Sequence, residues 1–180
     1  MKRDAGVGSG LGEEIGKRGP FEAAEVEAYL NLLRTSAILS GELSRFLRSH
    51  GLTEAKYNAL RILRGHKENG ERGVSCARIS RELVAPAPDV TRIVDGLVDV
   101  GLAERERTVE DRRVVLVRIT QKGLRLLSTM DKPLLDLHRH QMGHMSRREL
   151  SALSVLLAKA RAPSIGAHRA VDGDGDGEVG

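Results

Sequence analysis

With 180 residues, no tryptophan, two tyrosines and two phenylalanines, the chain must build its core from aliphatic side chains, which suits helices packed on helices. No apolar run reaches the roughly 18 residues that a membrane-spanning helix needs, so an integral membrane protein is excluded. A single cysteine cannot form an internal disulfide, which is typical of the reducing cytoplasm, and the formal net charge of +4 indicates a polyanion as partner.

The two ends of the chain are rich in glycine and charge and lack apolar periodicity. We expect residues 1–20 to form a flexible N-terminal tail and residues 163–180 a disordered acidic tail. The sequence DGDGDGE, which begins at Asp172, resembles the start of a calcium-binding loop, but the glutamate required at the twelfth position would fall beyond Gly180. We therefore interpret it as part of the acidic tail, without calcium.

Between the tails, apolar residues recur mostly at helical spacing. They predict one long helix over residues 21–50, which Gly51 ends. Thr53 is the expected N-cap of a second helix, and Ser75 is that of a third, shorter one. The prolines of residues 86–88 then separate the third helix from a fourth, because proline suits only the first turn of a helix.

A two-stranded hairpin is predicted after the fourth helix, which Gly101 closes. Residues 102–107 alternate between apolar and charged types, a turn follows, and residues 112–119 form the second strand. Thr120 then caps a long helix, in which Pro133 should cause a kink or an interruption. The last helix opens with a capping box made of Ser146 and Glu149.

This order of elements predicts a mainly α-helical fold with a small β-hairpin wing. A short helix, a tight turn and a second helix form a helix-turn-helix, whose second helix enters the major groove of DNA with its first turns at the base edges. Arg92 can read guanine, and Thr91 can bind phosphate or a thymine edge. The alternative for Arg92 is a surface ion pair with Asp95, and Asp89 could accept from cytosine or simply cap the helix. The exposed residues expected in these turns are Ala87, Asp89, Thr91, Arg92 and Asp95.

Residues 90–123 resemble the core signature of the MarR family, the multiple antibiotic resistance regulators. The resemblance extends more weakly over about residues 25–161. It implies a winged-helix homodimer that binds a pseudo-palindromic operator in double-stranded DNA, usually represses nearby genes, and is often released by a small, frequently phenolic, ligand. The matching positions are Val90-Thr91-Arg92, Gly101-Leu102, Glu104-Arg105, Asp111-Arg112-Arg113, Val117, Thr120 and Gly123.

The resemblance also implies roles for the charged residues of the wing. Asp111 and Arg113 match the family's Asp-x-Arg motif, in which the arginine enters the minor groove and the aspartate braces it. A guanidinium suits the narrow, electronegative minor groove, and a nearby carboxylate restricts its rotamers. Arg112, with Arg105 or Arg107 on the first strand, is then expected to contact phosphate.

The chain departs from the family pattern in two places. Gly96 stands where a long basic residue is common, which puts one contact with the DNA backbone in doubt. The Pro-Ala-Pro turn at residues 86–88 is less usual, and it can change how the recognition helix is aimed.

The leucines of the long helices predict a dimer. They are more numerous than one small winged helix can cover, and two-fold pairing would bury them and place two recognition helices about one DNA turn apart. We therefore assign residues 21–50 and 120–162 to dimerisation and residues 51–119 to DNA binding. The alternative is a monomer in which those helices fold back on the chain itself.

Other functional classes have less support. His140 and His144, with His138 nearby, have a spacing that can hold zinc, but we favour a solvated or dimer-facing histidine cluster without metal. Cys76, near a helix N-terminus, could sense redox state but is better interpreted as a small packing residue. No cofactor is expected, and no phosphate loop, Gly-x-Ser-x-Gly or zinc-protease motif indicates an enzyme. A winged helix used only for protein contacts would have an acidic or apolar recognition face, whereas arginines surround this one.

Overall fold

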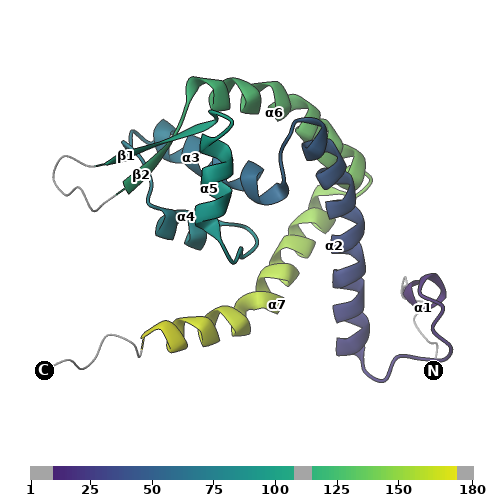
Figure 1. Cartoon of the computed structure of the whole chain (residues 1–180). Coiled ribbons are helices and arrows are strands. Elements are labelled where there is room, and N and C mark those ends of the chain that lie inside the picture. The colour runs from purple at the N-terminus through teal and green to yellow at the C-terminus, as the bar shows by residue number, and fades with distance from the viewer. Residues whose placement is uncertain (1–9, 108–114, 174–180) are drawn as a thin grey trace, which may run out of the picture. The chain divides into compact units, whose positions relative to one another are not determined.

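In the computed structural model, residues 10–107 and 115–173 are described, with their side chains as far as Pro163. The fold is mainly α-helical with one antiparallel hairpin, as predicted (Figure 1). None of the described helices is long and apolar enough to cross a membrane. The elements are α1 Leu11–Glu14, α2 Ala24–Ser49, α3 Glu54–Glu68, α4 Cys76–Glu82, α5 Val90–Val98, β1 Ala103–Arg107, β2 Val115–Ile119, α6 Gln121–Met142 and α7 Arg147–Gly173.

The chain divides into two compact units within α6. The first unit ends at Asp131 and the second begins at Lys132, next to Pro133. The helix is not interrupted at this proline, because α6 continues through it to Met142. A proline removes one N–H donor and crowds the carbonyl of the preceding turn, so the division falls where the helix is intrinsically weakest.

The starts of four helices follow from local capping groups, as the sequence predicts. Each capping oxygen accepts a backbone N–H that has no partner inside the helix. Glu149 also accepts the Ser146 N–H at 2.8 Å, which completes the capping box. The observed caps are Thr53 Oγ1 with the Lys56 N–H (3.3 Å), Ser75 Oγ with Arg78 (3.2 Å), Thr120 Oγ1 with Gly123 (3.1 Å) and Ser146 Oγ with Glu149 (3.3 Å).

The hairpin is extended by the loop that follows α3. Val74 and Val117 exchange N–H···O=C hydrogen bonds of 2.9 and 2.8 Å, so the loop lies against β2 as an isolated bridge. Gly73 makes this approach possible, because a Cβ there would lie 2.9 Å from Leu116 Cβ and 3.1 Å from the Val117 carbonyl oxygen. A glycine is thus required where the loop meets the strand.

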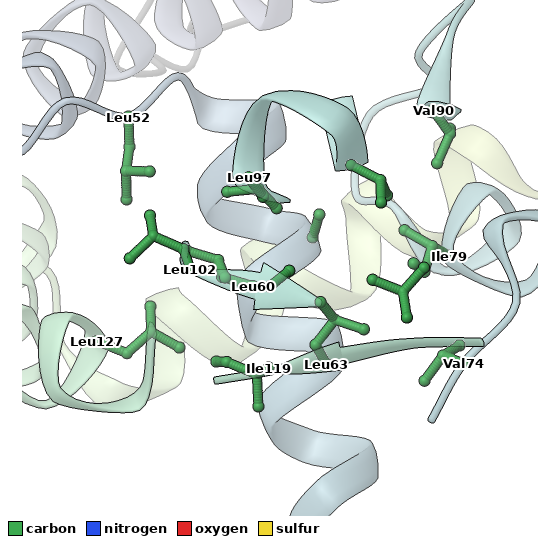
Figure 2. Packing of buried hydrophobic residues seen from close by; sticks show 14 of the residues in the cluster. Leu52, Leu60, Leu63, Val74, Ile79, Val90, Leu97, Leu102, Ile119 and Leu127 are labelled. Atoms are coloured by element: carbon green, nitrogen blue, oxygen red, sulfur yellow. The ribbon is translucent and has the colours of Figure 1, made fainter. Parts of the chain in front are cut away.

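One aliphatic core holds the first unit together (Figure 2). α3 contributes Leu60 and Leu63, which pack with side chains from α4, α5 and both strands. Burial of one such side chain contributes about 1.5–3 kcal/mol, so this cluster fixes α5 and the hairpin on α3. The largest fully buried side chains are Leu47, Leu60, Leu63, Ile79, Leu97, Leu127, Met130, Val74, Val94 and Val117.

The start of α6 is joined closely to the end of α5. The Thr120 hydroxyl donates to the Gly101 carbonyl at 2.8 Å while its oxygen accepts the Gly123 N–H. Gly123 has no room for a side chain, since a Cβ would overlap the Leu102 carbonyl oxygen and lie 2.8 Å from Ile119 Cγ1. These contacts give a structural reason for two positions of the signature, the threonine and the glycine.

The structure differs from the flexible tail predicted for residues 1–20. Within this segment α1 forms, its Leu11 is only 3% exposed, and its Glu14 pairs with Arg34 of α2 at 2.6 Å. One apolar side chain of this segment, Leu11, is buried, and this contact together with the ion pair between Glu14 and Arg34 joins α1 to the rest of the first unit.

The structure also differs from the tail predicted to begin at residue 163. α7 continues past Pro163 to Gly173. The turn before the proline is rich in alanine, the best helix former, and a proline removes only one helical hydrogen bond. The helix therefore extends into the segment whose glycine and charge content predicted a tail.

Candidate nucleic-acid interface

α5 has the amphipathic division that a recognition helix needs. Its apolar stripe, Val90, Val94 and Leu97, is buried in the core of the first unit. Thr91 and Arg92 lie on the exposed side of the same helix, as expected. The buried stripe therefore holds the helix in place, and the polar residues remain available to a partner.

The turn before α5 is fixed by polar contacts at both of its ends. The Asp89 carboxylate accepts the Arg92 N–H at 2.9 Å, so of its two possible roles Asp89 fills that of the N-cap. At the end of α4, the Val84 N–H donates to Asn58 Oδ1 at 2.6 Å, which ties the turn to α3. Ala87 was expected to be exposed, but it is half-buried against the core while the prolines on either side of it are exposed.

Asp95 connects the recognition helix to the hairpin. Its carboxylate accepts from Arg105 Nη2 of β1 at 2.7 Å, with the two side chains 55% and 31% exposed. The surface pair between Arg92 and Asp95 that the sequence left open is therefore not formed. In the described part of the chain Arg92 has no ion pair, so its guanidinium can meet an external acceptor.

The hairpin carries a second set of charges. β1 and β2 pair from Ala103 opposite Ile119 to Arg107 opposite Val115, so Arg107 stands at the last described pair of the ladder, where it is exposed. The three wing residues of the Asp-x-Arg motif lie outside the described residues: Asp111, Arg112 and Arg113.

Arg118 on β2 serves the hairpin itself. Its guanidinium pairs with Glu104 at 3.0 Å and with Glu106 at 2.6 Å across the strands. Opposite charges on facing strands stabilise the pairing of an antiparallel ladder. Arg118 therefore belongs to the frame of the hairpin, unlike the exposed Arg107.

A charge cluster around the buried His66, which the sequence did not indicate, fixes the first helix of the helix-turn-helix. His66 of α3 is 8% exposed, and its Nδ1 and Nε2 lie 2.6 Å from Glu71 Oε1 and Glu82 Oε2. Since both ring nitrogens face carboxylates, both must donate, which requires the protonated imidazolium. The hydrogen bond to Glu82 and then that to Glu71 raise the pKa of His66 above its ordinary value of 6.5. Arg78 pairs with both carboxylates at 2.7 and 2.9 Å and completes the cluster.

The weaker site candidates find little support. The described residues contain no group of three or more metal-binding side chains, and Asp136, one turn before His140, is already paired with Lys132 at 2.6 Å. Cys76 is half-buried and packs against the core, in keeping with a small packing residue.

Known proteins share both the sequence and the architecture of this region. The family model described as MarR family matches residues 50–114. The crystal structure of a MarR transcription factor from Planctomyces limnophilus is 36% identical, covers 77% of this chain and 98% of that one, and has a TM-score of 0.59. The chain belongs to the MarR family.

As a MarR-family member it is a winged-helix transcription regulator, and the fold class predicted from sequence is confirmed. The HTH-type transcriptional repressor IacR from Pseudomonas putida is 28% identical over 126 residues, which is 70% of this chain and 72% of that protein. The organohalide-sensing regulator RdhR in its 2,4-dichlorophenol-bound form shares the fold, with a TM-score of 0.68 at 20% identity over 80% of this chain and 85% of that one. These relatives are regulators of transcription.

Proposed function

We propose that this MarR-family regulator is a homodimeric repressor that binds a pseudo-palindromic operator in double-stranded DNA and is released by a small ligand. The observation that carries the proposal is α5, whose apolar stripe is buried while Arg92, which has no ion pair among the described residues, is exposed on the helix that precedes the hairpin. An arginine in this position can bind guanine through two hydrogen bonds in the major groove.

The contacts with DNA divide by groove. Thr91 and Arg92 face base edges, and Arg113, braced by Asp111, enters the minor groove. Phosphates are bound by Arg107 and by wing residue Arg112.

Arg105 has a shared role at this interface. Its pair with Asp95 orients α5 against the hairpin, and its remaining N–H groups can bind phosphate.

The dimer follows from the apolar surface of the long helices. Tyr29 is 61% exposed and Leu33 48% exposed on α2, and in the second unit Val155 is 64% exposed. Clusters of exposed apolar side chains mark interfaces, and a two-fold pairing covers each patch with its own copy. A dimer also places two recognition helices about 34–36 Å apart, one turn of DNA. The other exposed large apolar side chains of α2, α6 and α7, among the described residues, are Val26, Leu32, Ile38, Leu135 and Leu156.

A candidate ligand site lies in the first unit, between α1 and α2. A largely apolar hollow there has a volume of about 420 Å³, which suits a small aromatic molecule. RdhR, which shares the fold, is known with 2,4-dichlorophenol bound, so phenols are the first class to test. The hollow is lined by Leu11, Ile15, Leu30, Leu33, Arg34, Ala37 and Ile38.

The proposal is tested by measuring binding to the DNA upstream of the chain's own gene and to a scrambled duplex at two salt concentrations. We expect a preference for the upstream DNA that persists at the higher salt concentration, because base contacts are less sensitive to salt than phosphate contacts. Equal affinity for both duplexes contradicts operator binding.

Variants and ligands then separate the parts of the proposal. Arg92→Ala should cost about 1–3 kcal/mol of operator binding, and Arg113→Ala should weaken binding without unfolding the protein. Arg125→Ala, which removes an exposed arginine of α6, serves as the matched control. Phenols and aromatic acids are then added to the complex of the protein with its operator. If none of them releases the DNA, only the ligand part of the proposed function is contradicted.

A further inference from the structure

Lys56 of α3 reaches across to the recognition helix. Its Nζ donates to the carbonyl oxygen of Gly96 at 3.3 Å, between residues 40 positions apart in the chain. Gly96 lies inside α5, where a glycine costs about 1 kcal/mol relative to alanine. Gly96 therefore lowers the stability of α5 locally.

The position of Lys56 explains why a glycine stands here. A Cβ on this residue would lie 2.6 Å from Lys56 Nζ and 2.8 Å from Lys56 Cε. The end of the lysine side chain thus occupies the position of the missing side chain. Gly96 admits an ammonium group from another helix to the surface of α5.

This ammonium stands on the same side of α5 as Arg92. Both residues line one open groove between the first turn of α3 and α5. Arg92 is one helical turn before Gly96, and residues four apart share a helix face. Two cations from two helices are therefore presented together. The groove is also lined by Thr53, Pro88, Asp89, Asp95 and Asp99.

The Lys56 ammonium group has more N–H donors than the described residues provide acceptors for. An ammonium has three N–H donors, and the described residues provide one acceptor, the Gly96 carbonyl. Two of the three carboxylates in the groove are engaged elsewhere, because Asp89 caps α5 and Asp95 pairs with Arg105. Among the described residues that line the groove, Asp99 is the one carboxylate without a cap or an ion pair, and the two remaining Lys56 N–H groups can bind an incoming anion.

We propose that Lys56 binds a DNA phosphate next to the bases that α5 reads, held in place by the Gly96 carbonyl. The inference rests on the proposed operator binding and adds a contact from α3 to those of α5 and the wing. The ammonium group of a lysine binds phosphate as a point charge, without the fixed two-pronged geometry of an arginine. A lysine that is held only at its Nζ atom can therefore bind a phosphate.

The test is the salt dependence of operator binding by Lys56→Met, which keeps the length of the side chain and removes its charge. Each phosphate contact makes the slope of log affinity against log salt concentration steeper by about 0.9. The slope of the variant should therefore be shallower than that of wild type by about 0.9 for each protomer. Between 50 and 200 mM salt, wild type should therefore lose about threefold more affinity per contact than the variant. Lys56→Arg should keep the wild-type slope.

Lys67→Met is the matched control, because Lys67 is an exposed lysine at the other end of α3. It should leave both affinity and slope unchanged. If Lys56→Met weakens binding and lowers the melting temperature but keeps the wild-type slope, Lys56 merely joins two helices and the inference is overturned. If wild type itself does not prefer its operator, the proposed function fails instead.

A second variant covers the case in which Lys56→Met does not fold. Gly96→Ala must displace the flexible end of Lys56 while improving the helix propensity of α5. We expect it to weaken operator binding in the wild-type background and to have no further effect when combined with Lys56→Gln. Full additivity of the two changes would overturn the inference.

Discussion

α5 and α2 differ in how far the chain itself covers their apolar side chains. α5 buries its entire apolar stripe within the first unit. α2 buries only Leu47 near its C-terminal end, and every residue from Leu32 to Ile38 is exposed. The recognition helix is thus completed by its own fold, whereas the described residues, α1 included, leave much of the length of α2 exposed. A helix with this much exposed apolar surface is stable only when something packs on it.

The largest effect should come from breaking the burial of α5. Leu97→Ala removes a fully buried side chain and leaves a cavity, so it should lower the free energy of unfolding by about 2–5 kcal/mol. Leu32→Ala on α2, where the side chain is 43% exposed, should cost far less within the protomer. Chemical denaturation of both variants checks the comparison, and equal losses would contradict it.

The next effect should come from the exposed side of α2. Tyr29→Asp places a charge in the proposed dimer interface and should weaken association by about 2 kcal/mol, or roughly thirtyfold in the dimer dissociation constant. Analytical ultracentrifugation over a range of protein concentrations measures this shift. Ser80→Asp, at an exposed position of α4, is the control and should leave the mass unchanged. A wild-type protein that is monomeric at every concentration would refute the dimer.

A smaller, pH-dependent effect is expected from the charge cluster at α4. Because the folded-state pKa of His66 is raised, its contribution to stability is complete below its ordinary value of 6.5 and is lost as pH rises through the folded-state value. The pKa values of Glu71 and Glu82 are lowered, chiefly by their hydrogen bonds to His66, so their contribution is present above 4.5 and is lost as pH falls. The stability gap between wild type and His66→Gln should therefore be widest between about pH 4.5 and 6.5 and should narrow towards alkaline pH. Urea denaturation across this range measures it, and a gap that widens above pH 8 would show that the imidazolium is not the stabilising form.

The smallest effect concerns the link between α5 and the hairpin. Asp95→Asn weakens an exposed ion pair, which should cost less than about 1 kcal/mol of stability. The same change removes a carboxylate from the proposed DNA-binding face and frees Arg105, so affinity for non-operator DNA should rise. Fluorescence anisotropy with a random duplex detects the change. An unaltered affinity would mean that this face of α5 does not approach phosphate.

The parts of the fold that sequence predicted are those with local causes. Thr53, Ser75, Thr120 and Ser146 were recognisable as caps because each one bonds an N–H three residues further along the chain. The hairpin was equally clear, since the alternating pattern of its first strand follows directly on Gly101. Capping and strand alternation depend on neighbours in the chain, and such signals survive in a single sequence.

The parts that sequence missed depend on contacts between distant residues. Lys56 meets Gly96 across 40 positions, and His66 meets Glu82 across 16. Arg92 could be placed on α5, but only the structure shows that Asp95 pairs with Arg105 instead of with Arg92. Ala87 was misplaced because the Pro-Ala-Pro turn sends its side chain towards the core, a direction that periodicity cannot predict.

The joint between Thr120, Gly123 and the end of α5 has a mechanical consequence. There the backbone of α6 lies directly on the backbone that leads into β1, with no side chain between them that could repack. The stretch of α6 from Gln121 to Asp131 is therefore a lever arm of roughly 15 Å, at 1.5 Å per residue, fixed to the base of the hairpin. A rotation of that arm should therefore be passed to the base of the hairpin through the close approach of Gly123 to the Leu102 carbonyl.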